Sequence, residues 1–252
     1  MNKRLKLKKV ITNDGTLTLK SEEFNECYHS SEGAVTETLY KHIYPAFSVV
    51  QKDEIKILDI CFGLGYNTFL SILNRPKNSK LKIYSPEFDE KLVRSLKDFN
   101  YPKEFNSIKH IIDEVSQKYY YKDEFVEIEV FIGDAREYIK TLDEVDIVYQ
   151  DAFSPKVNTI LWTIEYFRDI DKLSPKIITT YSVATPIRYA LHTLGYNIYT
   201  HPYDNIRKGT LASKETLDFP DGEFLEKLKR VTPFYYEDKK IWIYYEIMIK
   251  YT

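Results

Sequence analysis

Residues 57–67 read Ile-Leu-Asp-Ile-Cys-Phe-Gly-Leu-Gly-Tyr-Asn, and this is the most informative part of the chain. An apolar run reaches an acidic residue, crosses a short loop that contains Gly63 and Gly65, and enters a helix-like stretch from Tyr66 to Leu73. This order is typical of a buried strand that leads through a tight turn into a helix N-terminus. Glycine at both loop positions allows a sharp turn and lets a ligand approach the main chain. We therefore expect a binding loop for a nucleotide-like cofactor.

The spacing around this loop distinguishes between the common cofactors. The dinucleotide pattern Gly-x-Gly-x-x-Gly/Ala is incomplete, because Thr68 occupies its third position. A P-loop requires a Lys-Ser/Thr pair, and none follows the glycines. S-adenosylmethionine carries no pyrophosphate, and its methyltransferases commonly show an acid followed by two or three alternating glycines. Asp59, Gly63 and Gly65 resemble that pattern, with Cys61 standing where the first glycine is usual.

The bulk composition fits a single globular α/β domain. The chain has 252 residues and a formal net charge of −2, so its surface as a whole does not attract polyanions. Two cysteines and five scattered histidines lack the spacing of a metal site, and we expect no bound metal. There is no long apolar run and no signal peptide, which predicts a cytoplasmic protein without a membrane span.

Strand-like and helix-like segments alternate along the chain beyond residue 50. Strands are expected at 55–60, 81–85, 127–132, 145–150, 177–182, 196–201 and 209–213, and helices at 89–99, 159–170 and 186–194. Residues 100–123 read as irregular or helical. Strands separated by helices predict a Rossmann-like, doubly wound and mostly parallel sheet, here with seven strands.

We expect this core to occupy residues 51–213 of a single domain, preceded by an extension over 1–50 and followed by an appendage over 214–252. The sequence Asn-Asp-Gly at 13–15 predicts a hairpin in the extension. Residues 34–50 look helical until Pro45 interrupts them. The appendage should end in a helix from about Lys239.

Polar residues gather where successive predicted strands end. The glycine loop follows the first strand, Glu87 the second, Asp134 the third and Asp151 the fourth. Ligands of doubly wound sheets bind beyond the carboxyl ends of the strands. Glu87 can accept hydrogen bonds from both ribose hydroxyls, and Asp134 can accept one from an adenine amino group. Asp151 would lie next to the transferred group.

Each acid also has a purely local interpretation. Glu87 can be a solvated residue at a helix N-terminus, Asp134 an Asx turn or helix cap, and Asp151 part of a turn. The local interpretations require four coincidences at the ends of successive strands, which favours a shared ligand site.

The segment 145–162 resembles the methyltransferase half of the bacterial tRNA wobble-uridine modification enzyme MnmC. It contains Tyr-Gln-Asp-Ala-Phe-Ser-Pro-Lys followed by Leu-Trp-Thr, where that family has Asp-Gly/Ala-Phe-Ala/Ser-Pro-x-x-Asn-Pro-x-x-Trp. The matching residues are Asp151, Phe153, Pro155, Asn158 and Trp162. Thr159 stands where the family has proline.

Weaker matches extend this resemblance to about residues 24–240. They include Tyr-His-Ser at 28–30, Glu-Thr at 37–38, the loop 62–67, Thr-Tyr-Ser at 180–182 and Arg188. The resemblance implies cofactor contacts from Tyr28, Glu37, Phe62, Gly63, Gly65, Asn67, Glu87, Asp134 and Asp151. It implies substrate contacts from Phe153, Lys156, Ser182 and Arg188.

The flavin-dependent half of the two-domain enzyme is missing, so the chain resembles the stand-alone form, MnmD. The implied cofactor is S-adenosyl-L-methionine, and the implied partner is the anticodon loop of tRNA. The implied reaction converts 5-aminomethyluridine, with or without 2-thiolation, to 5-methylaminomethyluridine at wobble position 34. This would link the protein to the enzymes that install the aminomethyl group. Asp151 would hold and orient the substrate ammonium and receive its proton.

Other interpretations remain open at this stage. Phe153 can stack on the uracil ring or belong to the core, and Lys156, Arg188, Arg207 and Lys208 can bind phosphates or be surface cations. An aminopropyltransferase of the spermidine synthase type shares the expected fold but normally has Tyr-His-Glu, where Ser30 follows Tyr-His here. A non-catalytic RNA-binding module on a decayed methyltransferase fold is the third possibility.

Overall fold

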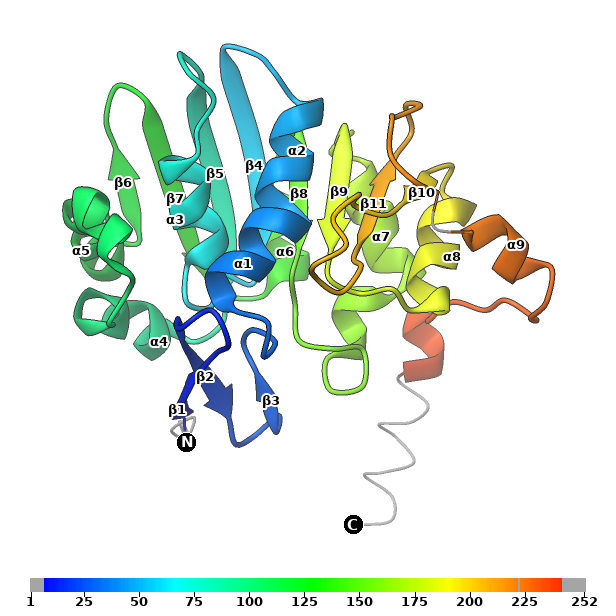
Figure 1. The fold of residues 1–252 in the computed structure, drawn as a ribbon, viewed down its shortest axis with the longest axis horizontal. Coiled ribbons are helices and arrows are strands. Elements are labelled where there is room, and N and C mark those ends of the chain that lie inside the picture. Colours follow the sequence, from blue (N-terminus) through cyan, green and yellow to red (C-terminus); the bar gives the residue numbers. More distant parts are fainter. Residues whose placement is uncertain (1–6, 222, 242–252) are drawn as a thin grey trace.

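The structure, a computed structural model, describes residues 7–221 and 223–241. Within these residues a sheet of eight strands crosses the molecule, in the order β10-β11-β9-β8-β4-β5-β7-β6 (Figure 1). The strands are β4 (Glu54–Ile60), β5 (Lys80–Glu87), β6 (Tyr120–Lys122), β7 (Val126–Ile132), β8 (Ile147–Gln150), β9 (Ile177–Thr180), β10 (Asn197–Tyr199) and β11 (Thr210–Ser213). The five central strands are parallel, while β6, β10 and β11 pair antiparallel.

The expected α/β fold with a mostly parallel sheet is confirmed, but the sheet has one strand more than the seven predicted. The additional strand, β6, lies in the segment 100–123 that reads as irregular or helical. It has only three residues and lies at the edge of the sheet. A strand of this length is too short for alternation to be visible in the sequence.

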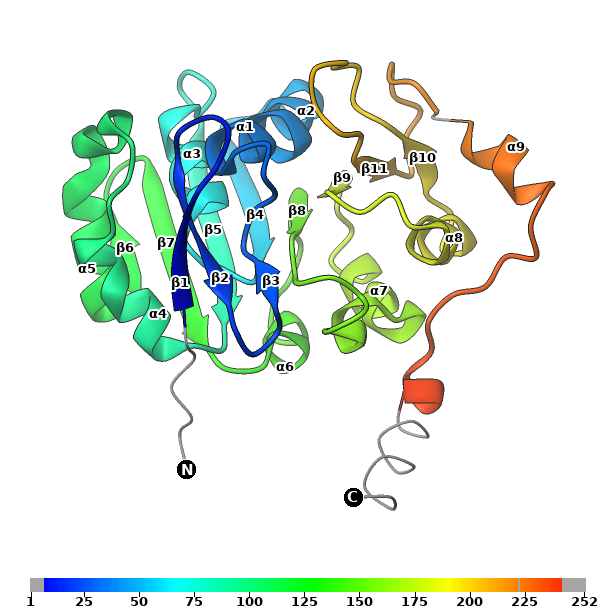
Figure 2. The same ribbon diagram turned by 60° about the horizontal axis from the view of Figure 1, so that its bottom comes forward.

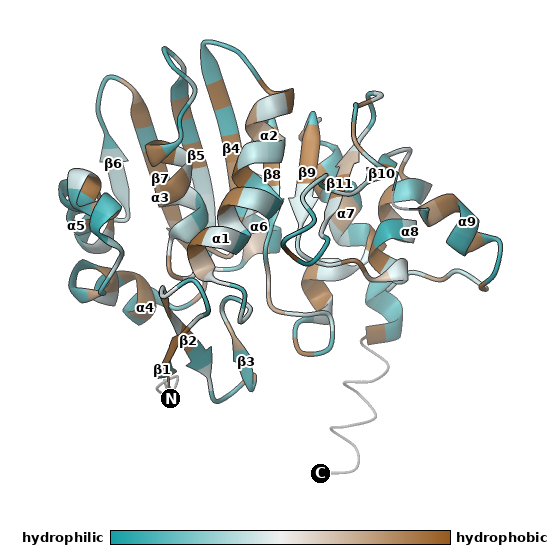
Figure 3. Ribbon diagram, viewed as in Figure 1, coloured by the Kyte–Doolittle hydropathy of each residue, from teal (hydrophilic) through white to brown (hydrophobic). Residues whose placement is uncertain are grey.

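Helices cover both faces of this sheet. They are α1 (Ala34–Thr38), α2 (Tyr44–Val49), α3 (Tyr66–Leu73), α4 (Glu90–Ser95), α5 (Lys109–Lys118), α6 (Ala135–Ile139), α7 (Ile164–Asp171), α8 (Thr185–Thr193) and α9 (Phe224–Leu228), with short 3-10 helices at Leu96–Asp98, Lys103–Ile108 and Thr159–Trp162. Along β4, Ile55 and Ile57 join the hydrophobic cluster of α1–α3 and α5, whereas Leu58 and Ile60 join that of α6–α8. Brown apolar bands mark β4, β5 and β7 in Figure 3, and β8 and β9 are buried along their whole length.

The N-terminal extension forms a separate small sheet beside the carboxyl ends of the central strands (Figures 1 and 2). It consists of β1 (Leu7–Ile11), β2 (Leu17–Ser21) and β3 (Glu26–Cys27) in antiparallel order. The predicted hairpin connects β1 and β2, and the Asp14 carboxylate closes it by accepting from Thr16 N and from Thr36 N, both at 3.0 Å. The two-residue strand β3 left no signal in the sequence.

The expectation that Pro45 interrupts the helix over 34–50 was wrong. Helix α1 continues through a π-helical turn, Leu39–Ile43, directly into α2, where Pro45 occupies the first turn. Because the π turn widens the main-chain bonding pattern just before Pro45, its missing N–H is accommodated without a break. The chain therefore stays helical from Ala34 to Val49.

The C-terminal appendage packs on the core through both apolar and polar contacts, with Phe224 buried in the cluster of α6–α8. Ile164 N donates to Tyr236 O at 2.9 Å, and the Arg136 guanidinium binds both carboxylate oxygens of Asp238 at 2.8 and 2.6 Å. Residues 238–241 are helical, and the remainder of the helix expected from Lys239 lies outside the described residues. No helix in the described part of the chain has the length and apolar character to cross a membrane.

The turn between β4 and α3 yields a test of backbone strain. Gly65 has φ +70°, and an added Cβ would lie 2.4 Å from Cε2 of the fully buried Phe69. Gly195 has φ +91° with open space around it. Gly195→Ala should lower the free energy of unfolding by about 1 kcal/mol, through strain alone. Gly65→Ala should lower it by roughly 1–3 kcal/mol more, because it also overpacks the core. Urea denaturation measures both free energies of unfolding. An equal loss of stability in the two variants would contradict the predicted overpacking at Gly65.

Candidate active site

The loop after β4 is strongly curved. Cys61, Gly63 and Gly65 all have left-handed backbone angles, with φ of +66°, +56° and +70°. For the non-glycine Cys61 this conformation costs roughly 1 kcal/mol. The Phe62 side chain is buried against Phe69, with ring centroids 5.7 Å apart, so only its main chain can face a ligand. The loop therefore offers main-chain atoms rather than side chains.

Glu87 lies at the end of β5, beside this loop. One carboxylate oxygen accepts from Gly63 N, and the other accepts from Phe88 N and Asp89 N, each at 2.8 Å. Burial raises the pKa of Glu87, while these three bonds oppose the rise. The neighbouring Phe88 is 84% exposed and presents an apolar ring at the same edge, a feature that the sequence analysis missed. A carboxylate held by the main chain next to an open ring suits a ribose and its base.

Two further carboxylates are joined by one amide. Asn67, in the first turn of α3, donates from Nδ2 to Asp59 Oδ1 at 3.1 Å and to Asp151 Oδ2 at 2.9 Å. Thr68 Oγ1 also donates to Asp59 at 2.8 Å. Burial raises the pKa of Asp59 to about 7 and raises that of Asp151 well above its usual range. The Asn67 Oδ1 atom is enclosed without a partner.

The surroundings of Asp151 are mainly acidic. Burial raises the pKa of the Cys61 thiol, and Glu87, Asp151 and Asp59 raise it further, so this side chain lies among the three carboxylates. Among the described residues no group of three or more His, Cys, Asp or Glu side chains has the arrangement of a metal site. A cluster of buried carboxylates with no metal-binding geometry suits an organic cation.

The π turn and α1 form one wall of this region. Lys41 is 3% exposed and binds Glu37 at 2.5 Å and Glu32 at 3.1 Å. Burial acts to raise the pKa of Glu37, but the Lys41 ammonium holds it below its usual value. The second Glu37 oxygen accepts from Ser30 N at 2.8 Å. Both oxygens of this predicted cofactor residue therefore have partners within the protein.

His42 is a residue of the site that the sequence analysis did not find. Its Nε2 lies 3.7 Å from Asp151 Oδ1, is fully enclosed and has no hydrogen-bond partner. Its Nδ1 lies 2.7 Å from Thr179 Oγ1 on β9. Burial lowers the pKa of His42 to about 3, so the ring is neutral. A lone histidine in a helix matches no motif, and only its place in the fold identifies it.

The N-terminal sheet fastens the loop that follows β8. Phe153 packs between Phe24 and Tyr28, with centroid distances of 5.1 and 4.9 Å. Ser154 N donates to Glu26 Oε2 at 3.0 Å, and Ser154 Oγ donates to Oε1 of the same carboxylate. Tyr28 also lies over Gly63, where an added Cβ would be 3.2 Å from its ring. The extension therefore contacts both loops of the site, through Phe24 and Glu26 as well as the predicted Tyr28.

The remaining predicted residues are more scattered. Asp134 caps α6, accepting from Arg136 N at 2.7 Å, so the helix-cap interpretation is confirmed. Lys156 is exposed on the loop after β8. Ser182 is buried beyond the end of β9, where its carbonyl accepts from Thr210 Oγ1 at 2.5 Å. Arg188 is buried in α8.

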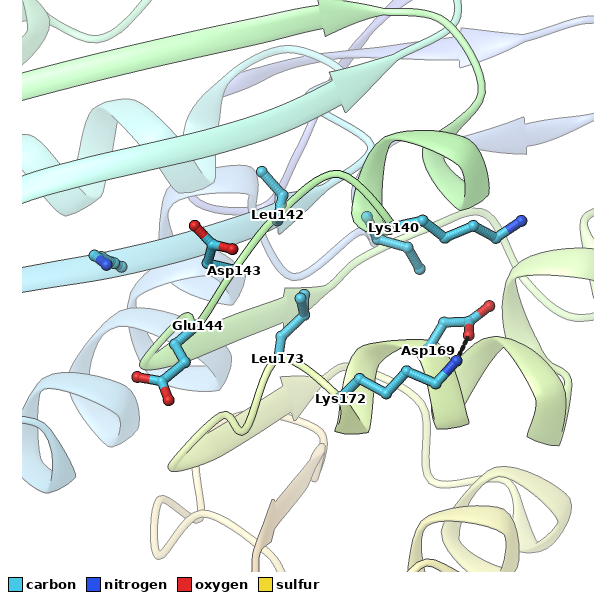
Figure 4. Close-up of a pocket in the computed structure, with 9 residues that line it drawn as sticks. Lys140, Leu142, Asp143, Glu144, Asp169, Lys172 and Leu173 are labelled. Atoms are coloured by element: carbon cyan, nitrogen blue, oxygen red, sulfur yellow. Dashed lines mark hydrogen bonds and ion pairs between the residues drawn. The ribbon is translucent and has the colours of Figure 1, made fainter.

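A cavity of about 590 Å³ lies elsewhere, near the amino ends of the central strands (Figure 4). It is lined by Lys56, Ile139, Lys140, Leu142, Asp143, Glu144, Asp169, Lys172 and Leu173. Lys172 and Asp169 neutralise each other at 2.7 Å. It includes neither the glycine loop nor the acidic cluster, so the fold directs cofactor binding to the opposite edge of the sheet.

The raised pKa of Asp59 predicts a pH dependence of stability. Between about pH 4 and 7 the folded protein retains a proton that the unfolded chain has lost, so the free energy of unfolding falls as pH rises through this window. Asp59→Asn should make the fall in the free energy of unfolding between about pH 4 and 7 shallower, while Glu87 and Asp151 leave part of it in place. Urea denaturation at several pH values measures this, with the exposed Asp143→Asn as the control. Parallel curves for wild type and Asp59→Asn would contradict the assignment.

Comparison with known proteins agrees with this geometry. A family model described as S-adenosyl-L-methionine-dependent methyltransferase matches residues 102–215. An uncharacterized protein of Methanocaldococcus jannaschii is 30% identical over 231 residues, covering 88% of this chain and 63% of that protein. The tRNA 5-methylaminomethyl-2-thiouridine biosynthesis bifunctional protein MnmC of Pseudomonas savastanoi is 26% identical, covering 80% of this chain and 34% of that protein. The chain thus spans less than two thirds of either relative.

A solved structure also matches this chain in three dimensions. The crystal structure of MNMC2 from Aquifex aeolicus has a TM-score of 0.78 and 30% identity, covering 90% of this chain and 77% of that one. The resemblance found in the sequence is confirmed, and so is S-adenosyl-L-methionine as the cofactor. The chain belongs to the MnmC-like family of S-adenosyl-L-methionine-dependent methyltransferases.

Proposed function

We propose that this protein methylates the exocyclic amine of 5-aminomethyluridine, with or without 2-thiolation, at wobble position 34 of tRNA. The product is 5-methylaminomethyluridine. The names of MnmC-like relatives support a tRNA substrate. The observation that carries the proposal is the partly buried Asp151 carboxylate, bound through Asn67 to Asp59 and placed beside the cofactor loop. Such a group suits an amine that must be held as a cation and then deprotonated.

The acid–base chemistry follows from the pKa of Asp151. When bound, S-adenosyl-L-methionine supplies an electrophilic methyl group on a sulfonium. A primary amine attacks only in its neutral form, yet it is largely protonated at neutral pH. Asp151 can bind the ammonium and accept its proton, and burial brings the pKa of this carboxyl upward, toward the range in which a general base works best.

The hydrogen bonds around Asp151 fix its orientation. Asn67 holds Oδ2, and the neutral His42 ring lies on the side of Oδ1. Tyr181 OH donates to Ala152 O at 3.0 Å, which holds the chain directly after Asp151. This rigidity matters because a misplaced acceptor amine loses most of the benefit of alignment with the methyl group.

The aromatic cluster of Phe24, Tyr28 and Phe153 supplies a surface for the target base. Phe153 is held by Trp162, whose Nε1 donates to Phe153 O at 2.8 Å. Bases of an anticodon loop are already partly exposed, so turning one toward this surface costs little. We further propose a cytoplasmic location, where such tRNA is modified, and a functional link to the enzymes that install the aminomethyl group.

The rival aminopropyltransferase requires free carboxylates for a diamine. Glu37 is neutralised by Lys41, and Ser30 occupies the place of the glutamate of the Tyr-His-Glu motif while its N–H binds Glu37. The retained set of Glu87, Asp134 and Asp151 likewise argues against a decayed, non-catalytic RNA-binding module. These features favour methyl transfer over the two alternatives.

The direct experiment is mass spectrometry of wobble nucleosides. The protein is incubated with labelled S-adenosyl-L-methionine and tRNA from cells that lack this methylation. We expect label in 5-methylaminomethyluridine at position 34. A parallel reaction contains decarboxylated S-adenosylmethionine and putrescine, and formation of spermidine there without labelled tRNA would overturn the proposal in favour of the rival.

Replacement of Asp151 tests the proposed mechanism. Asp151→Ala should lower kcat by at least about 100-fold, because general-base assistance is lost. Its affinity for the cofactor should change much less. Single-turnover methylation and calorimetric titration measure the two effects, and Asp169→Asn in the distant cavity serves as the control. Near-normal turnover of the Asp151 variant would remove this residue from the mechanism.

A further inference from the structure

Arg188 combines burial with the absence of an acidic partner. Its side chain is 6% exposed and lies in the first half of α8. Nε donates to Thr210 Oγ1 at 2.8 Å and Nη2 to Gly209 O at 3.2 Å, so both acceptors are neutral. Within residues 7–221 and 223–241 it takes part in no ion pair. Burial alone lowers its pKa, with no carboxylate acting against it.

Two other cations with little exposure have acidic partners, so the lack of one at Arg188 is unusual. Lys41 is also buried but binds two glutamates, and the partly buried Arg136 binds Asp238 through two hydrogen bonds. A buried charge without a counter-ion destabilises a fold, because it loses the solvation of water without gaining an ion pair. The hydrogen bonds to Thr210 and Gly209 go to neutral acceptors and therefore do not balance the charge. The retained charge therefore calls for an anion that is not part of the protein.

The guanidinium keeps one face available. Nη1 makes no hydrogen bond to the described residues and is not among their fully enclosed polar atoms, so it reaches the surface. The N-terminal end of α8, which favours negative charge, lies in the same part of the fold. An anion can therefore approach Arg188 without displacing a protein carboxylate.

The strand order places this group on the acceptor side of the site. Thr210, the partner of Arg188, pairs with Thr180 at the end of β9, and β9 is the neighbour of β8, which Asp151 follows. The glycine loop and Glu87 follow β4 and β5, on the other side of β8. Asp151 thus lies between the cofactor loop and Arg188. This order favours an anion of the substrate over the carboxylate of the cofactor.

We propose that Arg188 binds a backbone phosphate of the RNA next to the target nucleotide, and so sets which base lies beside Asp151. The inference rests on the proposed function for its RNA substrate. It distinguishes Arg188 from Lys156, an exposed cation on the loop after β8. A guanidinium that is already held in place binds phosphate with little loss of side-chain freedom.

The test compares Arg188→Gln, Arg188→Lys and wild type in binding to an unmodified anticodon stem–loop RNA. Arg188→Gln removes the charge and keeps one N–H donor near the position of Nε, whereas the contact of Nη2 with Gly209 O is lost. We expect it to weaken RNA binding about 10–100-fold, the effect of one charged hydrogen bond, and to reduce the salt slope of log Kd by about 0.7. Arg188→Lys should retain part of the affinity. The affinity for S-adenosyl-L-methionine should not change, and the exposed Arg168→Gln on α7 serves as the matched control.

A second measurement avoids any variant that fails to fold. Wild-type protein is titrated with stem–loop RNAs in which each phosphate that flanks the target uridine is replaced by a neutral methylphosphonate. One replacement should weaken RNA binding by wild type as much as Arg188→Gln does. When Arg188→Gln is titrated with that same RNA, the loss of affinity should be no larger than for either change alone. Full affinity with every replacement would overturn the inference, as would loss of cofactor affinity instead of RNA affinity in Arg188→Gln. If wild type methylates tRNA while Arg188→Gln binds RNA normally, only this inference fails, whereas absence of methylation by wild type refutes the proposed function.

Discussion

The amide of Asn67 is the contact on which the site depends. It donates to Asp59 at the end of β4 and to Asp151 after β8, and so ties two neighbouring strands and α3 together through one side chain. Asn67 reaches this position because the left-handed loop turns the chain directly from β4 into α3. The sheet thereby holds two carboxylates in an environment that disfavours their charged forms. A cofactor sulfonium and a substrate ammonium would both lower the free energy needed to ionise these two carboxyl groups.

The N-terminal extension is part of this site rather than an attachment to it. Glu26 holds the loop after β8, and Tyr28 lies against the loop after β4. The π turn contributes His42 and Lys41 to the wall beside Asp151. The parallel sheet thus supplies the acids at its carboxyl ends, while the extension closes the space around them. Loss of the Glu26 contact would free the Asp151 loop even though no acid of the sheet had changed.

Much of this arrangement was predictable because the parallel strands carry apolar runs or apolar–polar alternation and end at polar loops. The hydrophobic runs of β4, β5, β7, β8 and β9 locate the acids that follow them, and the segment 145–162 identifies the family. Edge strands of two or three residues, such as β3 and β6, carry no readable period. The π turn was missed because proline usually ends a helix, and the partners of His42 and Arg188 depend on contacts across more than 20 residues of sequence. The sequence marks Asp59 as the acid before the glycine loop, but its link to Asp151 appears only when Asn67 contacts both carboxylates.

The measurement that tests the central claim most directly is the proton balance of cofactor binding. S-adenosyl-L-methionine and S-adenosylhomocysteine, which lacks the sulfonium charge, are titrated calorimetrically near pH 7 in buffers of different ionisation enthalpy. A sulfonium beside buried carboxyl groups with raised pKa values should displace protons from them, so the account predicts net proton release on binding of S-adenosyl-L-methionine and less on binding of S-adenosylhomocysteine. An identical proton balance for the two ligands, or no binding of S-adenosyl-L-methionine, would contradict it.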